Sequence, residues 1–223
     1  MDLKEVAEPA LGLLGGSFDP IHNGHLQLAR DALTELPLGE VHFVPAAQPW
    51  QKNQMEVTAE HRARMVQLAI DSEPRFTLDM HEIERGGATY TIDTLRELRT
   101  LLPDRALVLI MGSDQFARFD TWRDWMEIAD TAHIAVAQRF GAKLNLSPAL
   151  QTLLDARQRK TARLAAQPGG CIVEFRMTPV DASATEVRRL LREPQSAQSE
   201  RRLTAMVPAA VLDYIRRHSL YRD

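Results

Sequence analysis

The sequence predicts an α/β fold in which a doubly wound parallel sheet carries a helical C-terminal elaboration. Three observations predict it: short apolar runs typical of buried strands, apolar residues at helical spacing between those runs, and a polar, arginine-rich final third. Strands that alternate with helices form βαβ units, whose parallel sheet is covered on both faces. The 223 residues, 44% of them hydrophobic, are enough for one sizeable core. We expect a single domain over residues 1–223, with a core at about 10–140 and a helical part at about 145–223.

Short apolar segments bounded by Gly, Pro or polar residues favour buried strands. These segments are Leu11–Leu14, Val41–Val44, Leu107–Met111, His133–Ala137 and Cys171–Arg176.

Helices are predicted where apolar residues recur every three or four positions. They cover Leu26–Leu36, Met65–Ala69 after a cap at Thr58, Leu95–Leu102 after a cap at Thr91, Pro148–Ala166, Ser183–Arg192, and Pro208–His218 with Pro208 in the first turn. The polar stretch Glu193–Glu200 is a predicted loop.

Composition excludes several classes of protein. A formal net charge of -3 is unlike that of a general nucleic-acid binder, which would be basic. The single cysteine, Cys171, builds neither a disulfide framework nor a thiolate zinc cluster. The first residues carry acids where a signal peptide needs bases, and no apolar run is long enough to span a membrane. We therefore expect a cytoplasmic protein without nucleic-acid or membrane partners; the sequence does not indicate its oligomeric state.

The segment Leu11–His25 joins a predicted strand to a predicted helix start through Gly15 and Gly16. Paired glycines let the backbone approach a ligand closely and adopt positive φ. A helix start that follows them offers unpaired N–H groups and the positive end of a dipole, which together bind phosphate. His22 and His25 project from one face of the first turn, because residues three apart are neighbours there. The segment therefore predicts a nucleotide site at the switch point of the sheet.

Two alternatives to this interpretation remain open. The segment is also compatible with an ordinary tight turn that carries incidental histidines. A metal site at His22 and His25 is the other alternative, although no third ligand stands at an obvious spacing.

A second segment, Ser183–Arg188, fits a capping box in which Glu186 reaches back to the Ser183 amide. Arg188 and Arg189 follow in the same first turns. An arginine beside a helix start and two hydroxyls forms a second anion site. Arg189 is expected to be an exposed surface charge.

The letters GGSFDPIHNGH, residues 15–25, closely resemble the signature of the nucleotidyltransferases related to class I tRNA synthetases, whose motif is Thr/His-x-Gly-His. SATEVR, residues 183–188, resembles the Ser-Ser/Ala-Thr-x-Ile/Val-Arg element with which this family binds the β- and γ-phosphates of ATP. The resemblance implies a Rossmann-like nucleotidyltransferase fold, with His22 and His25 as the catalytic pair. The implied ATP-binding residues are Gly15, Gly16, Ser17, Phe18, His22, His25, Lys52, Gly112, Asp114, Ser183, Thr185 and Arg188.

Within this superfamily, further segments resemble the bacterial nicotinate mononucleotide adenylyltransferases. TYTIDTL (89–95), MGSDQF (111–116) and DTWRDW (120–125) correspond to the Ser-Tyr-Thr, Gly-x-Asp and Pro-Thr-Trp segments of that family. The resemblance implies that Tyr90, Thr91 and Trp122 bind the acceptor, whereas Trp125 is expected in the core. The loop at residues 45–52 departs from the family pattern, and Lys52 alone keeps its basic position.

The resemblance implies in-line transfer of AMP from ATP to nicotinate mononucleotide, with no covalent enzyme intermediate. Mg²⁺ would bridge phosphate oxygens, held mostly by water and the phosphates rather than by a protein cage. Another adenylyl- or cytidylyltransferase, such as pantetheine-phosphate adenylyltransferase, and a non-catalytic nucleotide sensor remain alternatives. A Rossmann dehydrogenase is disfavoured, because the first glycine segment is not GxGxxG.

Overall fold

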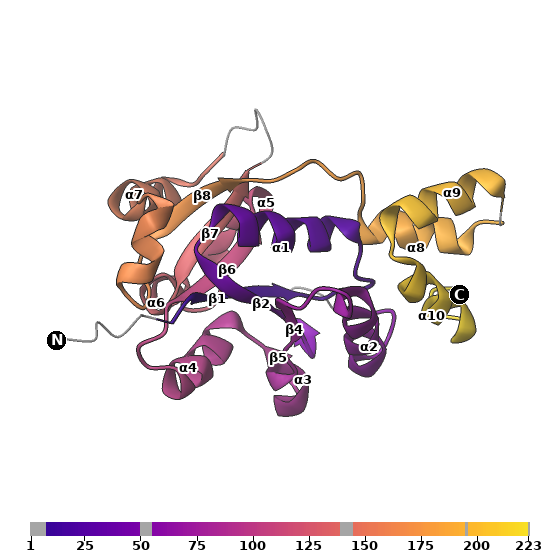
Figure 1. Cartoon of the computed structure of the whole chain (residues 1–223), viewed down its shortest axis with the longest axis horizontal. Helices are drawn as coiled ribbons and strands as arrows, with labels where there is room; N and C mark the ends of the chain where they lie inside the picture. The colour runs from indigo at the N-terminus through magenta and orange to yellow at the C-terminus, as the bar shows by residue number, and fades with distance from the viewer. Residues whose placement is uncertain (1–7, 50–54, 139–144, 195, 223) are drawn as a thin grey trace. The chain divides into compact units, whose positions relative to one another are not determined.

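A computed structural model describes residues 8–49, 55–138, 145–194 and 196–222 (Figure 1). In chain order its elements are β1 (Ala10–Gly16), α1 (Asn23–Glu35), β2 (Leu38–Pro45), β3 (Gln48–Pro49), α2 (Ala59–Ile70), β4 (Phe76–Leu78), α3 (His81–Arg85), β5 (Ala88–Thr89), α4 (Thr91–Leu101), β6 (Leu107–Gly112), α5 (Ser113–Phe116), the 3-10 turn η1 (Phe119–Thr121), α6 (Trp125–Thr131), β7 (His133–Gln138), α7 (Pro148–Arg157), the 3-10 turn η2 (Thr161–Ala166), β8 (Ile172–Arg176), α8 (Ala184–Arg192), α9 (Ala197–Met206) and α10 (Ala209–Arg217).

A six-stranded sheet has the order β4-β2-β1-β6-β7-β8. The pairs β1–β6, β6–β7 and β7–β8 are parallel, with Leu11 opposite Leu107 and Val108 opposite His133. The chain first runs outward from β1 to β2 and later returns past β1 to β6. The strand order therefore reverses direction at β1, which is the pattern of a doubly wound sheet. The predicted doubly wound parallel sheet is confirmed.

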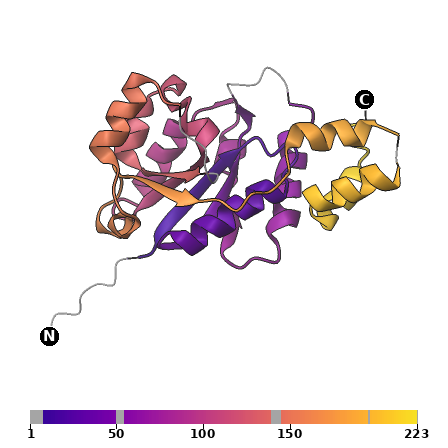
Figure 2. The ribbon, with the colours of Figure 1, turned by 90° about the horizontal axis from the view of Figure 1, so that it is seen from above.

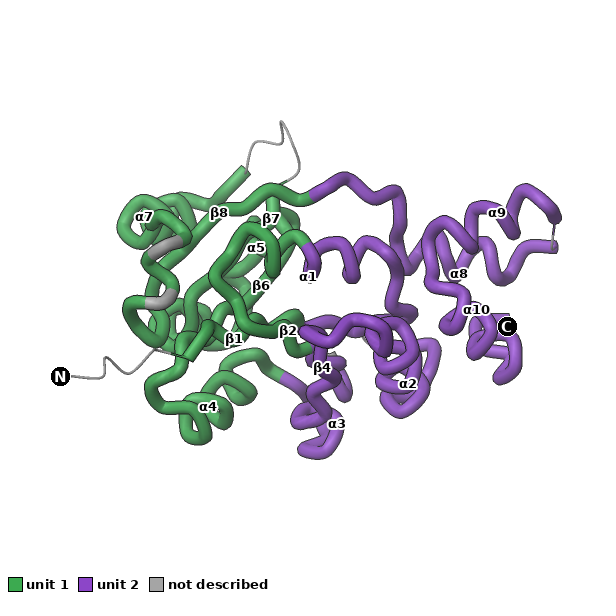
Figure 3. Tube along the Cα trace, in the orientation of Figure 1, with its two compact units in different colours: residues 1–14, 31–42, 90–177 green, residues 15–30, 43–89, 178–223 purple. Residues whose placement is uncertain are grey.

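Two compact units divide the chain (Figure 3). Unit 1 comprises Met1–Leu14, Asp31–His42 and Tyr90–Met177, and unit 2 comprises Gly15–Arg30, Phe43–Thr89 and Thr178–Asp223. The strands β6, β7 and β8 lie in unit 1, whereas the glycine segment and the helices α8 to α10 lie in unit 2. The three last helices lie together in Figure 2.

The core of unit 1 follows from continuous apolar strands. Every residue of β6 from Leu107 to Met111 is buried, as is every residue of β7 from His133 to Ala137. A strand of a parallel sheet is covered on both faces, so it carries an apolar run instead of an alternation. This is why these two strands are recognisable from sequence.

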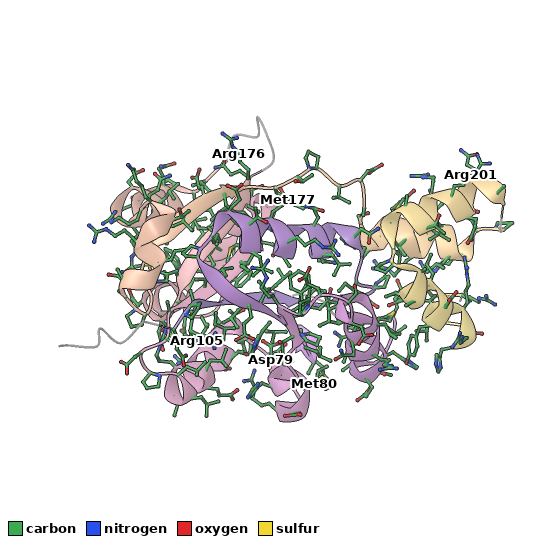
Figure 4. The ribbon with its side chains drawn as sticks, viewed as in Figure 1. Asp79, Met80, Arg105, Arg176, Met177 and Arg201 are labelled. Atoms are coloured by element: carbon green, nitrogen blue, oxygen red, sulfur yellow. The ribbon has the colours of Figure 1, made fainter. Side chains whose placement is uncertain are left out.

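In unit 2, polar side chains accept hydrogen bonds from backbone amides where the helices α2 and α3 begin. Asp79, labelled in Figure 4, follows β4, and its amide donates to the Phe43 carbonyl at 2.9 Å. The Asp79 carboxylate accepts from the His81 amide at 3.0 Å, which starts α3. On α2, Thr58 is the predicted N-cap and accepts from the His61 amide.

The structure corrects several predicted boundaries. The helix predicted over Pro148–Ala166 ends at Arg157, because Gln158 leaves the helical conformation and pairs with Ile172 in a parallel bridge. Thr91 is the first residue of α4, and Tyr90 rather than Thr91 is its N-cap. Pro208 is likewise the N-cap of α10 and precedes its first turn.

The loop predicted at Glu193–Glu200 is also wrong, because α9 begins inside it. Ser196 and Ser199 form a reciprocal capping box there, in which each side chain accepts from the other's backbone amide. Of the helix's own residues only Ser199, Leu203 and Met206 are buried, so its apolar pattern is weak. The short elements β3, β4, β5 and α3 were not predicted either. No helix within the described stretches is both long and apolar enough to cross a membrane.

Candidate active site

The segment between β1 and α1 has the form expected of a phosphate-binding loop. A Cβ atom added to Gly15 would meet nothing within 4 Å, so the backbone there is open to a ligand. A Cβ atom on Gly16 would lie 3.0 Å from the Phe18 ring, so this position needs glycine for close packing. Among the described residues, however, the glycines with positive φ are Gly86, Gly87 and Gly170. The expectation of positive φ at the glycine pair is therefore wrong; Phe18 adopts it instead, at 47°.

His22 and His25 lie together at the start of α1, as predicted. Their rings stack with centroids 3.8 Å apart and an interplanar angle of 27°. The His22 amide donates to Nδ1 of His25 at 3.3 Å, so a neutral His25 carries its proton on Nε2. The buried Phe18 ring supports His25 edge-on at 5.1 Å.

His22 is buried, and burial lowers its pKa from 6.5 to about 4. The ring is therefore neutral at neutral pH, because removal from water disfavours the charged form. Its Nδ1 is buried without a hydrogen-bond partner among the described residues. A Cβ atom on Gly24 would lie 3.0 Å from this nitrogen, so the glycine of the His-x-Gly-His motif makes room for the ring. A neutral imidazole with one unsatisfied nitrogen can still form a hydrogen bond with a ligand.

Ser183 caps α8 as predicted, accepting from the Glu186 amide at 3.2 Å. The other half of the predicted capping box is replaced by ion pairs, because the Glu186 carboxylate contacts Arg189 at 2.7 Å and Arg202 at 2.6 Å. Thr185 is exposed in the first turn. Arg189 is half exposed at 48%, so it is the surface charge that was expected.

Within unit 2 the two predicted phosphate-binding segments meet. Arg188 Nη1 donates to the Asp19 carbonyl at 2.6 Å, which connects the first turns of α8 to the glycine segment. The Cβ position of Gly24 lies 3.5 Å from the Ala182 carbonyl, so the start of α1 adjoins the start of α8. Two helix N-termini therefore converge on one region, where both dipoles favour an anion.

Three residues of this region were missed by sequence reasoning. Arg62 is completely buried and donates to the Ser17 carbonyl at 2.7 Å and to the Ala47 carbonyl at 2.9 Å. Burial lowers the pKa of Arg62, and the Asp19 carboxylate opposes that effect. The only sequence signal was an arginine on the apolar face of α2, one turn before Val66.

The other two missed residues, Glu56 and Tyr221, contact Asp19. Tyr221 donates its hydroxyl to Asp19 Oδ1 at 2.7 Å, and the Glu56 amide donates to Oδ2 at 3.2 Å. Neither residue was singled out from the sequence, because both are far from Asp19 along the chain. The predicted Lys52 lies outside the described residues.

The residues predicted to bind the acceptor lie in unit 1. Tyr90 is the N-cap of α4 and makes no side-chain cap bond, so Thr91 opens the helix with its first-turn amides. The guanidinium of Arg123 stacks on the Tyr90 ring at 4.6 Å from the centroid. Sequence reasoning did not single out Arg123, although it directly follows Trp122.

Trp122 ends the turn η1 and packs edge-on against Phe119, with ring centroids 5.6 Å apart. Its indole Nε1 is buried and has no hydrogen-bond partner in the described part of the chain. Trp125 also contacts Phe119, at 5.9 Å, and is half-buried. The prediction that Trp125 belongs to the core is therefore wrong.

Gly112 and Asp114 lie where β6 passes into α5, also in unit 1. Gly112 is the N-cap of this four-residue helix, and Asp114 is an exposed residue of its first turn. Across the described ranges no group of three or more His, Cys, Asp or Glu side chains is arranged to hold a metal ion. The alternative of a metal site at His22 and His25 therefore has no third ligand within those ranges.

The fold and these motifs match known proteins. The family model described as cytidylyltransferase-like matches residues 13–190. A probable nicotinate-nucleotide adenylyltransferase of Dechloromonas aromatica is 43% identical over 98% of this chain and 100% of its own length. A protein of the same name from Bordetella petrii is 44% identical over 95% of this chain and 98% of its own length.

A solved structure supports the fold alone. It is the Plasmodium falciparum nicotinic acid mononucleotide adenylyltransferase complexed with NaAD, with a TM-score of 0.72 at 17% identity, covering 96% of this chain and 97% of the other. These matches confirm the resemblance that the glycine and SATEVR segments indicate. The chain therefore belongs to the nicotinate-nucleotide adenylyltransferase family, within the wider cytidylyltransferase-like family.

Proposed function

We propose that this chain transfers the AMP unit of ATP to nicotinate mononucleotide, and that both compact units belong to one catalytic domain. The observation that carries the proposal is the convergence of the α1 and α8 N-termini in unit 2, connected by the bond from Arg188 to Asp19. Relatives named as probable nicotinate-nucleotide adenylyltransferases support the choice of acceptor, since the match covers 98% of this chain.

The reaction is an in-line displacement at phosphorus. A phosphate oxygen of the mononucleotide forms a bond to the α-phosphorus of ATP. The bond from that phosphorus to the bridging oxygen breaks, and pyrophosphate leaves with the electron pair. The attacking oxygen is already anionic, so no general base is required, and the product is deamido-NAD. Catalysis then depends on orientation and on offsetting the charge that develops on the leaving group.

His22 and His25 are the proposed catalytic pair. Because burial keeps the pKa of His22 low, at about 4, this ring approaches ATP as a neutral hydrogen-bond donor. The negative triphosphate would raise that pKa, because a nearby opposite charge favours the imidazolium. His25 donates from Nε2, since its Nδ1 accepts from the His22 amide.

The remaining proposed ATP contacts are the other residues that the family motifs single out. The open backbone at Gly15 and Gly16, the cap at Ser183 and Thr185, and Arg188 serve the phosphates. Other proposed contacts to ATP are Ser17, Phe18, Lys52, Gly112 and Asp114. Phe18 acts through its backbone and by supporting His25, because its side chain is buried.

Mg²⁺ enters with ATP as part of the substrate. The phosphates and water would supply most of its ligands, because Mg²⁺ usually keeps several waters. Its charge would offset the charge that develops on the leaving pyrophosphate.

The acceptor is proposed to bind at Tyr90, Thr91 and Trp122. Thr91 begins α4 without a side-chain cap, whereas the Asp93 amide donates to the Tyr90 carbonyl at 3.0 Å. The proposed donors to the nicotinate carboxylate are therefore the amides of Thr91 and Ile92. The indole of Trp122 offers a face for the pyridine ring.

Pyrophosphate release tests the proposal. The chain is incubated with ATP and Mg²⁺ together with nicotinate mononucleotide, pantetheine phosphate or no acceptor. Release that depends on nicotinate mononucleotide supports the proposal. Release with pantetheine phosphate would assign the chain to a different transferase reaction, and ATP binding without any release would favour a nucleotide sensor. The cytoplasmic location stays a prediction from sequence.

A further inference from the structure

Asp19 connects the two phosphate-binding segments of unit 2. The residue is only 3% exposed, so each carboxylate oxygen needs a partner. Tyr221, which follows α10, donates to Oδ1 at 2.7 Å, and the Glu56 amide donates to Oδ2 at 3.2 Å. The Asp19 side chain is thus fixed from two distant parts of the sequence.

The same group of residues fixes Arg188. Nη1 of Arg188 donates to the Asp19 carbonyl at 2.6 Å, and Nε pairs with the Glu56 carboxylate at 2.8 Å. The second carboxylate oxygen of Glu56 pairs with Arg192. Neither contact of Arg188 uses Nη2, so this nitrogen is in place to donate to a phosphate. An arginine whose planar fork is held in advance loses less rotamer freedom when it binds an anion.

We propose that Tyr221 and Glu56 are positioning residues for the ATP phosphates. Tyr221 orients Asp19, and Asp19 together with Glu56 holds the Arg188 guanidinium with Nη2 directed to the ligand. The inference rests on the proposed function, because it takes Arg188 as a ligand of the triphosphate. Neither positioning residue touches the substrate.

The hydroxyl of Tyr221 is suited to this task. The ring is buried, with 5% of its surface exposed. Burial and the Asp19 carboxylate raise the pKa of Tyr221 above its usual range, so the hydroxyl stays protonated and donates. A tyrosine that merely anchored the chain after α10 would stabilise the fold without affecting ATP selectively.

The first experiment compares Tyr221→Phe with Tyr214→Phe. Both changes remove one hydroxyl; that of Tyr214 bonds to His61 Nδ1 at 2.9 Å and not to Asp19. We expect Tyr221→Phe to raise the Kd for ATP in calorimetry, and the KM for ATP, about three- to tenfold. The KM for nicotinate mononucleotide should change less than about twofold. Tyr214→Phe should leave both values near those of the wild type.

A double-mutant cycle connects the effect to Arg188. In an Arg188→Ala background, Tyr221→Phe should have no further effect on ATP binding, because the group it positions is gone. An equal loss with and without Arg188, or equal weakening of both substrates, would overturn the proposal.

If Tyr221→Phe fails to fold, Glu56→Gln keeps the test available. The Glu56→Gln variant should weaken ATP binding. Glu193→Gln is the matched control, because it removes the same charge from a residue that pairs with Arg189. Tighter ATP binding by Glu56→Gln would show that Glu56 competes with phosphate, contrary to a positioning role.

ATP binding is measured separately from turnover, so two kinds of failure can be told apart. Wild-type protein that binds ATP but transfers nothing to nicotinate mononucleotide defeats the proposed function. Wild-type protein that catalyses the transfer, with ATP binding unchanged in Tyr221→Phe, defeats only the positioning role.

Discussion

Acidification should destabilise this protein through His22. Burial holds the pKa of His22 at about 4, against 6.5 for an exposed imidazole. Above pH 6.5 the ring is neutral in the folded and the unfolded chain, so it makes no pH-dependent contribution. Between pH 6.5 and 4 the His22 imidazole is protonated in the unfolded chain but stays neutral in the folded chain. The free energy of unfolding therefore falls as the pH falls.

The size of the effect follows from the two pKa values. Each pKa unit corresponds to 1.36 kcal/mol, so the linkage through His22 removes about 2 kcal/mol by pH 5 and about 3 kcal/mol by pH 4. Typical domains are stable by only about 5–15 kcal/mol, so a loss of this size is measurable. Burial also lowers the pKa of His133, which therefore contributes in the same direction.

The measurement is urea unfolding of the wild type and His22→Gln from pH 8 to pH 4. His133 is present in both proteins, so its contribution cancels in the difference between them. We expect the wild type to lose about 3 kcal/mol more than the variant over this range. Parallel pH profiles would refute the reasoning, because His22 would then titrate alike in both states. ATP at saturating concentration should reduce the pH dependence of the wild type, since the phosphates raise the pKa of His22.

The other predictions concern turnover, stability and selectivity. His22→Ala should lower kcat by about 10²–10³, the usual effect of losing one donor to developing charge, and near-normal turnover in a pyrophosphate assay would remove His22 from the site. Arg62→Met should destabilise the fold by about 2–5 kcal/mol in urea unfolding, because it removes the buried guanidinium that donates to the Ser17 and Ala47 carbonyls; a stability within 0.5 kcal/mol of wild type, the range of a surface change, would contradict that reading. Nicotinate mononucleotide should be preferred over its nicotinamide analogue by roughly tenfold to thousandfold in kcat/KM, because the α4 amides suit a carboxylate. Equal values would indicate a dual-specificity enzyme.

The central strands of the sheet could be predicted because each is a continuous apolar run in the sequence. The runs at β6 and β7 are apolar along their whole length, as strands buried on both faces must be. The short strands β3 and β5 have two residues each and pair with each other, so no period could be detected. For η2, composition misled the prediction: its Ala-rich sequence favours helix, but the pairing of Gln158 with Ile172 ends α7 first.

The phosphate-binding residues His22, His25 and Arg188, which local motifs predicted, lie together in unit 2. The residues that support them were not predicted. His22, His25 and Arg188 stand in recognisable segments. Arg62 and Tyr221 act through contacts 45 and 202 residues away in sequence, to Ser17 and Asp19 respectively. Such contacts depend on tertiary packing, for which a single sequence carries no local signal.

The loop between β1 and α1 concentrates features that stability alone would not favour. Phe18 has a positive φ of 47°, a conformation that costs a bulky residue free energy. Nδ1 of His22 and Nε of Arg62 are both buried without partners among the described residues, and each such group costs about 1–3 kcal/mol. The charge of Arg62 is kept completely buried behind Ser17. In the free protein, rigid packing must offset these costs. A bound polyanion that forms a hydrogen bond with the His22 ring and is attracted by the Arg62 charge would offset part of them. Binding energy from the triphosphate would then stabilise the conformation that the reaction needs. Local backbone and hydrogen-bonding preferences are therefore violated in this loop, whereas they hold in β6 and β7.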